Sequence, residues 1–164
     1  MKKQNFEIKQ KIIIDLDVVT VALWNKKGNQ LNIADKFIGR VKQKEFNIIN
    51  PFFLIELVLK WKYEELRENI KEFYLNYSDK ILSDTDISEQ AAKKILDPND
   101  IIPHIIKIGI KDEDALLVFV SSLFELDYLV TFNRKHLRNN VKKINEVLKR
   151  FGLNEIKIVL PDEI

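Results

Sequence analysis

Two aspartates follow an apolar run near the start of the sequence. In the stretch IIIDLDVVT, residues 12–20, Asp15 and Asp17 come directly after three isoleucines. Two kinds of chemistry use such a pair. Asp15 can act as a nucleophile in phosphoryl transfer, or it can bind a metal ion in a nuclease. The other acids that stand in apolar surroundings decide between these hypotheses.

Two more carboxylates occur where most neighbouring residues are apolar. Glu56 lies within PFFLIELVLKW, residues 51–61, and Asp114 lies at the head of DEDALLVFVSSLF, residues 112–124. A carboxylate in an apolar setting costs free energy unless something pairs with it. Together with Asp15, these acids would repel one another without a cation, and Mg²⁺ or Mn²⁺ bound through oxygen ligands is the natural compensation. The sequence therefore predicts a metal site formed by Asp15, Glu56 and Asp114.

Each acid also has a purely structural interpretation. An aspartate after a strand often caps the next helix, and Asp17 is the better candidate for the cap. The acids at 112–114 would stabilise a helix N-terminus through the helix dipole. Glu56 can face solvent on one side of its helix. Singly these acids are weak signals, but their order along the chain favours a site.

Short apolar segments alternate with amphipathic ones along the chain. We expect strands at 12–14, 46–49, 128–131 and 156–160. We expect helices at 18–27, 32–44, 52–61, 63–77, 88–96, 112–126 and 134–151, with a turn at 97–100 and with Asn50-Pro51 as a helix start. This alternation predicts an α/β fold, a three-layer α/β/α sandwich around a mainly parallel sheet of about four to five short strands.

The sheet would bring the polar residues together. In open parallel sheets, ligands bind beyond the carboxyl ends of the strands. Asp15 follows the first expected strand, whereas Thr131 ends the third and Asn133 comes just after it. We therefore expect these residues at the same edge of the sheet.

Composition limits the classes of protein that are plausible. The 164 residues, of which 46% are apolar and 32% charged, predict one globular domain spanning 1–164. A net charge of +2 does not by itself indicate a nucleic-acid partner. The absence of cysteine excludes disulfides, thiol catalysis and cysteine-based zinc sites. With no apolar run of about 18 residues and no signal-peptide pattern, we expect a cytoplasmic protein without a membrane partner.

The opening motif is similar to that of the haloacid dehalogenase-like phosphatases. In that family the first aspartate, here Asp15, attacks phosphorus and the second, here Asp17, acts as acid and base. Such a phosphatase also needs a pair of acids downstream of the threonine that ends a later strand. After Thr131 the only acids are Glu146, Glu155, Asp162 and Glu163, and none follows a strand in such a pair. The phosphatase is therefore the weaker alternative.

The whole chain resembles the PIN-domain family, the fold of many ribonuclease toxins of toxin–antitoxin pairs. IIIDLDVV looks like the family's opening strand and first acid, and INPFFLIELV is similar to its second motif, a helix that carries glutamate. DEDALLVFVSSLFELDYLVTFNRKHL resembles its most distinctive block, and IKIVLPDEI its final strand. The resemblance implies a PIN-like fold and metal-dependent hydrolysis of phosphodiester bonds in single-stranded RNA.

The resemblance also implies roles for individual residues. It makes Asp15, Glu56 and Asp114 catalytic metal ligands for Mg²⁺ or Mn²⁺. It adds Asn133 and Asp112 as further candidate ligands, and it places Asp17, Thr131 and His136 around them. An antitoxin protein and a second copy of the chain, in a homodimer, are the expected protein partners.

The chain departs from the family pattern after its LVT segment. Family members commonly carry an aspartate two or five residues later, where this chain has Asn133 and His136. An amide brings no charge to a metal site. The alternative function is therefore a PIN-fold protein that binds RNA or protein and has lost catalysis.

Basic residues after the third expected strand provide a candidate RNA-binding surface. Arg134, Arg138 and Lys142 recur every four residues, so they would share one face of the expected helix 134–151. A solvated helix face remains the alternative. The segment 63–103 makes the chain longer than many compact toxins of the family, and we expect it to form a helical extension or a lid.

Overall fold

The computed structural model describes residues 8–24 and 28–164 and contains one five-stranded parallel sheet. The strands lie in the order β3-β2-β1-β4-β5. Their bounds are Lys11–Ile14 (β1), Asn47–Pro51 (β2), Lys80–Leu82 (β3), Tyr128–Val130 (β4) and Ile158–Val159 (β5). The predicted parallel α/β sheet is confirmed, although β3 was not expected. The end of the expected helix 18–27 lies at 25–27, outside the described residues.

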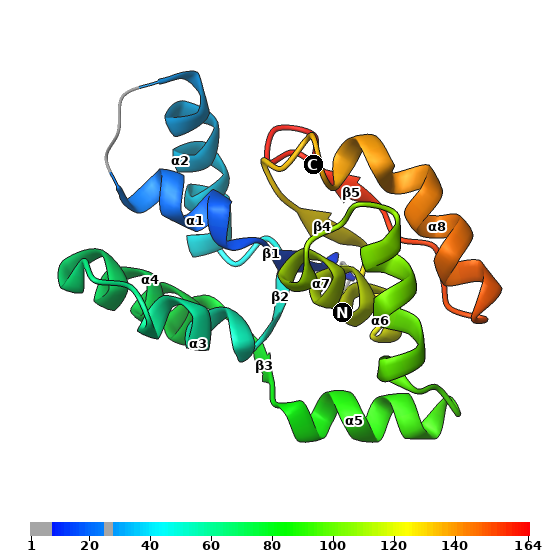
Figure 1. Cartoon of the computed structure of the whole chain (residues 1–164). Coiled ribbons are helices and arrows are strands. Elements are labelled where there is room, and N and C mark those ends of the chain that lie inside the picture. The colour runs from blue at the N-terminus through cyan, green and yellow to red at the C-terminus, as the bar shows by residue number, and fades with distance from the viewer. Residues whose placement is uncertain (1–7, 25–27) are drawn as a thin grey trace, which may run out of the picture.

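Eight α-helices and one 3₁₀ turn connect these strands within the described residues (Figure 1). Their bounds are Leu16–Leu23 (α1), Asn29–Lys42 (α2), Phe53–Leu59 (α3), Glu64–Tyr77 (α4), Asp84–Lys93 (α5), Pro98–Lys107 (α6), Asp112–Leu123 (α7), Arg138–Asn140 (η1) and Val141–Arg150 (α8).

The helices form two layers because parallel connections are right-handed. From β1 to β3 the chain moves across the sheet in one direction, and from β3 to β5 it moves back. Right-handed connections therefore place α1–α4 on one face and α5–α8 on the other. Figure 1 shows α1–α4 gathered on one side of the strands and α6–α8 on the other. The predicted three-layer arrangement agrees with this structure.

The central strand β1 is buried on both faces. Ile12, Ile13 and Ile14 are each 0% exposed, as expected for a continuous apolar run between two helical layers. Shortening any of them to alanine should cost about 2–5 kcal/mol of folding free energy. The buried strand therefore fixes the position of Asp15, the residue that follows Ile14.

Two buried polar side chains hold the carboxyl end of β1. The Ile14 amide donates to Asn50 Oδ1 at 3.0 Å, and the Tyr74 hydroxyl on α4 donates to the Ile14 carbonyl at 3.0 Å. The next amide, of Asp15, donates to the Val130 carbonyl at 2.9 Å. The backbone at Asp15 is therefore tied to β2, α4 and β4.

The expected helix start at Asn50-Pro51 is wrong. Both residues belong to β2, Pro51 is opposite Leu82 of β3, and α3 begins at Phe53. The Asn50 side chain replaces a backbone acceptor for Ile14 and also donates to Ser78 Oγ at 2.9 Å. The polar side chain of Asn50 therefore links β1 to the end of α4 and does not cap a helix.

The segment between α4 and α7 also differs from expectation. Helix α5 begins at Asp84 with Ser83 as its cap, in a capping box with Asp86, and not at Ser88. The expected turn at 97–100 is the start of α6, where Asp97 is the N-cap and Pro98 occupies the first turn. Because β3 pairs with β2, the segment 63–103 is not only helical, and part of it belongs to the sheet.

The last expected helix is divided. Residues 134–137 are turns, η1 covers Arg138–Asn140, and α8 begins only at Val141. Asn140 donates to the carbonyls of Lys135 and His136, which closes a turn where a continuous helix was predicted. Among the helices at 8–24 and 28–164, none is long and apolar enough to cross a membrane.

Candidate functional site

The carboxyl ends of β1 and β4 form the switch point of the sheet. After β1 the chain fills one side of the sheet with β2 and β3, and then it returns to place β4 on the other side of β1. The divergence of connections at such a point leaves a crevice where open α/β proteins bind ligands. Asp15 follows β1 and Thr131 follows β4, so both residues lie at this edge, as predicted.

Asp15 is buried at the start of α1. Its side chain caps the helix, with Oδ1 accepting from the Leu16 amide at 2.7 Å, and its exposed fraction is 7%. The other oxygen, Oδ2, accepts from the Thr131 hydroxyl at 2.7 Å. Asp15 is thus the helix cap, and the expectation that Asp17 plays this role is wrong. The extended backbone of Asp15 (φ −66°, ψ 149°) suits a cap.

Asp17 joins α1 to the segment after β4. Its carboxylate accepts from the Phe132 amide at 3.1 and 3.2 Å, and the Thr131 hydroxyl lies 3.2 Å from Asp17 Oδ2. A hydroxyl has one proton, so Thr131 can donate to only one of its two acidic neighbours at a time. The shorter contact favours Asp15, and the Phe132 amide serves Asp17.

Asp114 approaches the same edge from the first turn of α7. Its Oδ2 accepts from Asn133 Nδ2 at 2.9 Å, and the oxygen of the same amide accepts from the His136 backbone N–H at 3.0 Å. The Asn133 amide therefore orients Asp114. The oxygen expected as a metal ligand accepts a hydrogen bond from the His136 backbone in this arrangement.

Burial and nearby negative charges raise the pKa values of the three aspartates. Burial is the largest cause for each. It acts with the charges of Asp17 and Asp114 to raise the pKa of Asp15 to about 8, against the hydrogen bond from Thr131. The pKa of Asp17 rises to about 6, and that of Asp114 also rises, although the charges of Lys111 and His136 oppose it. These acids therefore hold protons more strongly than ordinary carboxyl groups.

Glu56 and Asp112 occupy more open positions. Both side chains are exposed, Glu56 in the first turn of α3 and Asp112 in the first turn of α7. Neither side chain forms a hydrogen bond or an ion pair with a residue that the structure describes. Across positions 8–24 and 28–164, no three acidic or histidine side chains are arranged as a group that could hold a metal ion.

The chemistry of the donors nonetheless suits a hard cation. Asp15, Asp17, Asp114 and the Thr131 hydroxyl offer only oxygen atoms, the ligands that Mg²⁺ and Mn²⁺ prefer. The charges of Asp17 and Asp114 raise the pKa of Asp15, and the charge of Asp114 raises that of Asp17. A divalent ion would relieve this repulsion and favour the deprotonated forms. The donor atoms are thus of the type that such an ion takes, but binding would require these side chains to come closer together than they do among the described residues.

The predicted basic stripe does not form one helix face. Arg134 lies in the turn before η1, Arg138 lies in η1, and only Lys142 belongs to α8. Arg138 also pairs with Glu163, which in addition accepts from the Leu160 amide. The four-residue spacing therefore does not place these three side chains on one helix face. In addition, Arg138 already has an acidic partner in Glu163.

Sequence reasoning missed residues that position the candidate site. Asn50 and Tyr74 hold the end of β1, and Lys111 lies close enough to Asp114 to oppose the rise in its pKa. An asparagine in the otherwise apolar run before Pro51 was a usable signal for Asn50. Tyr74 gave no such signal, because an aromatic residue on an amphipathic helix is usually only part of the core.

Comparisons of the sequence with protein-family models and with curated proteins found no match of either kind. The candidate site therefore rests on the fold and on the chemistry of its own residues.

Proposed function

We propose that the protein is a metal-dependent endoribonuclease that hydrolyses phosphodiester bonds of single-stranded RNA. The observation that carries this proposal is the group of three aspartates with raised pKa values at the switch point of a parallel sheet. Clustered carboxylates at a ligand-binding edge favour metal-assisted phosphate chemistry. The resemblance to the PIN family supports RNA as the substrate.

Asp15 and Asp114 are the proposed principal ligands of Mg²⁺ or Mn²⁺. Asp17 and Thr131 hold Asp15 in place, and Glu56 remains a proposed ligand because α3 starts at the same edge, just after β2. The bound ion would supply charge stabilisation at the phosphate and a lowered pKa for a water molecule. The chain itself orients the carboxylates and, through its packed helices, limits the access of water to Asp15.

A cleavage assay with an end-labelled single-stranded RNA of mixed sequence tests this proposal. We expect cleavage with Mn²⁺ or Mg²⁺ and none with EDTA. Asp15→Asn and Asp114→Asn should each lower the rate by at least about a hundredfold, since each removes a ligand. Asp100→Asn is the matched control, because Asp100 is an exposed aspartate in the first turn of α6 and has no proposed role in the site. Cleavage that continues unchanged in EDTA contradicts the metal mechanism.

A catalytically impaired RNA- or protein-binding protein is the second candidate function. It is favoured by the neutral Asn133, whose amide nitrogen faces Asp114 where the family commonly has an acid. This candidate predicts that the protein binds RNA but cleaves none with either metal ion. Asn133→Asp should then restore cleavage if only the fourth charge is missing.

Two further measurements separate the remaining hypotheses. Release of phosphate from p-nitrophenyl phosphate, without cleavage of RNA, would favour the haloacid dehalogenase-like phosphatase. A small antitoxin-like reading frame next to the gene would support a toxin role, and co-purification with its product would identify the antitoxin. Sedimentation analysis tests the proposed homodimer.

A further inference from the structure

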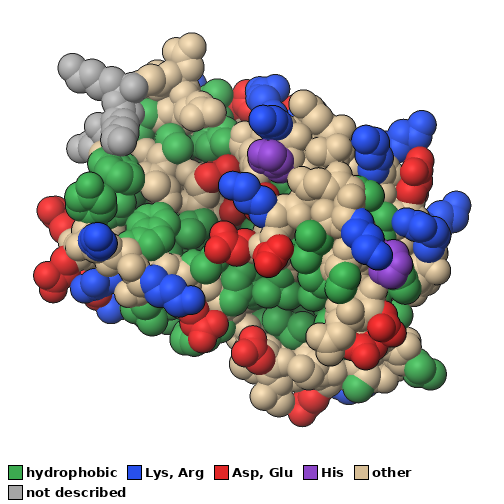
Figure 2. Space-filling view, viewed as in Figure 1, with side chains coloured by type: hydrophobic (Ala, Val, Ile, Leu, Met, Phe, Trp, Pro, Cys, Tyr) green, Lys and Arg blue, Asp and Glu red, His purple; other side chains and the backbone are tan. Residues whose placement is uncertain are grey.

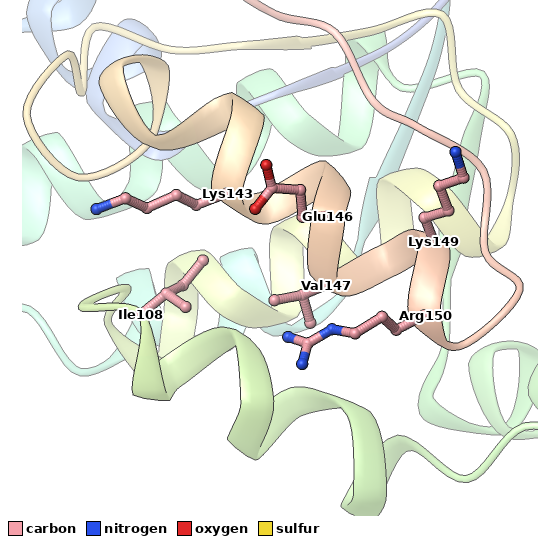
Figure 3. A pocket seen from close by; sticks show the side chains of 6 residues that line it. All are labelled: Ile108, Lys143, Glu146, Val147, Lys149 and Arg150. Carbon is pink, nitrogen blue, oxygen red and sulfur yellow. The ribbon is translucent and has the colours of Figure 1, made fainter.

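A shallow groove with basic walls lies between α6 and α8. It has a volume of about 790 Å³. Its floor is apolar, and its walls carry three cations and one acid; the lining residues are Ile108, Lys143, Glu146, Val147, Lys149 and Arg150. In Figure 3 Lys143 and Arg150 extend from α8 on either side of Val147, with Ile108 of the α6 end opposite. The groove thus combines apolar contact with exposed positive charge.

The cations of this groove have no acidic partners among the residues that the structure describes. Lys143, Lys149 and Arg150 are exposed, and none of them forms an ion pair with any residue in the described part of the chain. Arg138, by contrast, is neutralised by Glu163. Figure 2 shows Lys and Arg side chains gathered on the side of the molecule where α8 lies.

Helical spacing places the groove residues on one face of α8. Lys143, Val147 and Arg150 are separated by four and then three residues, so their side chains project from the same face. Ile144, Val147 and Leu148 are buried, and α8 packs against α6 and α7. Val147 therefore lies at the bottom of the groove, and the exposed side chains of Lys143 and Arg150 beside it are the parts of α8 that are available to a ligand.

The groove leads away from the acidic edge. Helix α8 runs from the carboxyl end of β4 towards the start of β5, so its first turn is nearest the edge that holds Asp15. At the other wall, Ile108 is followed within a few residues by Lys111 and Asp114. The ten residues of α8 span about 15 Å, a length suited to several phosphates of an extended strand.

We propose that this groove binds the phosphate backbone of single-stranded RNA as it leaves the acidic edge, through Lys143 and Arg150. The inference rests on the proposed function for the identity of the polyanion. Free cations along an apolar floor suit a single strand, in which phosphates contact basic groups and bases contact uncharged surface. Glu146, the acid among the lining residues, opposes this binding and limits the affinity.

Fluorescence anisotropy with a labelled single-stranded RNA in EDTA tests the groove without any cleavage. The Lys143→Glu/Arg150→Glu variant should bind more weakly, and its log–log salt slope should be smaller by about 0.7 for each lost phosphate contact. Lys36→Glu/Lys93→Glu is the matched control, because both residues are exposed on other helices and the charge change is identical. Glu146→Gln should bind RNA more tightly than the parent.

The outcomes distinguish the groove from a general charge effect. An equal loss of binding in both double variants overturns the inference, and so does an unchanged salt slope in the groove variant. If poly-L-glutamate binding depends on Lys143 and Arg150 while RNA binding does not, the groove belongs to an acidic protein and the inference fails. Equal melting temperatures of the variants and the parent confirm that the fold is retained.

A label placed in the groove provides an independent reading. Because the chain contains no cysteine, Ile108→Cys accepts a thiol-reactive fluorophore at a single position. RNA should shift its emission, and the same label at Lys36→Cys should not respond. Since both measurements are made without metal, RNA that binds the groove but is never cleaved contradicts only the proposed nuclease. RNA that is cleaved without contacting the label contradicts only the groove.

Discussion

Asp15 combines a structural role with the proposed metal-binding role in one carboxylate. One oxygen caps α1 and the other accepts from Thr131, so the group is fully engaged while almost buried. A carboxylate in such a position is usually stabilised by a cation. Burial is the main reason why its pKa rises in spite of two hydrogen bonds, and the charges of Asp17 and Asp114 add to the rise.

The raised pKa values predict how stability depends on pH in the absence of divalent ions. An unfolded aspartate has a pKa of about 3.9, whereas folding raises the pKa of Asp15 to about 8 and that of Asp17 to about 6. Between these limits the folded chain holds more protons than the unfolded chain. Its free energy of unfolding should therefore fall as the pH rises from about 4 to about 8.

Thermal unfolding in EDTA across this pH range measures the effect. Asp15→Asn keeps the shape and the acceptor oxygen but cannot ionise, so most of the decrease should disappear. Glu56→Gln is the control, because Glu56 is exposed and its side chain has no partner among the described residues. A pH profile of Asp15→Asn identical to the parent would falsify the buried-charge explanation.

The hydroxyl of Thr131 should matter more than its methyl group. Thr131→Val removes the hydroxyl that donates to Asp15. The same hydroxyl oxygen accepts from the backbone N–H of Asn133 at 2.9 Å, and that hydrogen bond is lost as well. We expect a loss of about 1–3 kcal/mol of unfolding free energy at pH 8, where Asp15, with a pKa of about 8, is roughly half ionised. Thr131→Ser keeps the hydroxyl and should retain most of that stability. Urea denaturation of the three proteins checks the order, and equal losses for Val and Ser would assign the role to packing.

At the scale of elements, the ends of α5 and α8 show the same cap with different residues. Both helices close with paired hydrogen bonds to their last turn, and the residue after the cap has a positive φ. At α8 this residue is Gly152, with φ 71°, but at α5 it is Ile95, with φ 57° and 93% exposed. A β-branched residue is strained in this conformation.

Substitutions at these two positions should change the free energy of unfolding in opposite directions. Ile95→Gly should stabilise the fold by about 1 kcal/mol. It removes backbone strain, and because Ile95 is exposed, no buried apolar contact is lost. Gly152→Ala should destabilise it by a similar amount. Both differences can be measured by urea denaturation at one pH. Destabilisation by Ile95→Gly would indicate that the exposed isoleucine makes contacts that matter in solution.

Periodicity predicted the elements whose apolar faces are wide and failed where local polar contacts decide. The buried run Ile12–Ile14 and the helices at 29–42 and 64–77 follow directly from their patterns. β3 has three residues, too few for a pattern. The turn at 134–140 depends on Asn140 and on the Asn133 side chain, contacts that no helical spacing reveals. α6 was missed because Pro98 suggested a turn, although proline suits a first helical turn.

The sequence predicted part of the candidate site, as it predicted part of the fold. The strand ends brought Asp15, Thr131 and Asn133 together, as the parallel sheet required. The sequence left open whether Glu56 faces the site or solvent, because the rotation of a helix about its axis depends on how its whole face packs. It favoured Asp17 over Asp15 as the cap, because the first residue of a helix is also fixed by local contacts such as that between Asp15 and the Leu16 amide.

For the whole molecule, binding of a divalent ion should be visible as added stability. A ligand that binds only the folded state at about a hundred times its Kd adds about 2.7 kcal/mol. We expect Mn²⁺ to raise the melting temperature of the parent at pH 8 and to leave that of the Asp15→Asn/Asp114→Asn variant nearly unchanged. The same rise in both proteins would place the metal ion elsewhere. Ca²⁺ provides a comparison for general ionic effects.

The strand order has a consequence for synthesis on the ribosome. β1 is made early, but β4, its neighbour in the sheet, follows more than a hundred residues later, since Asp15 and Thr131 are 116 positions apart. Contacts between such distant segments form late in folding. A nascent chain that has not yet emerged beyond Thr131 lacks the hydroxyl partner of Asp15 and the β4 side of the switch point. The proposed nuclease would therefore remain inactive towards the messenger being translated until most of its chain has left the exit tunnel.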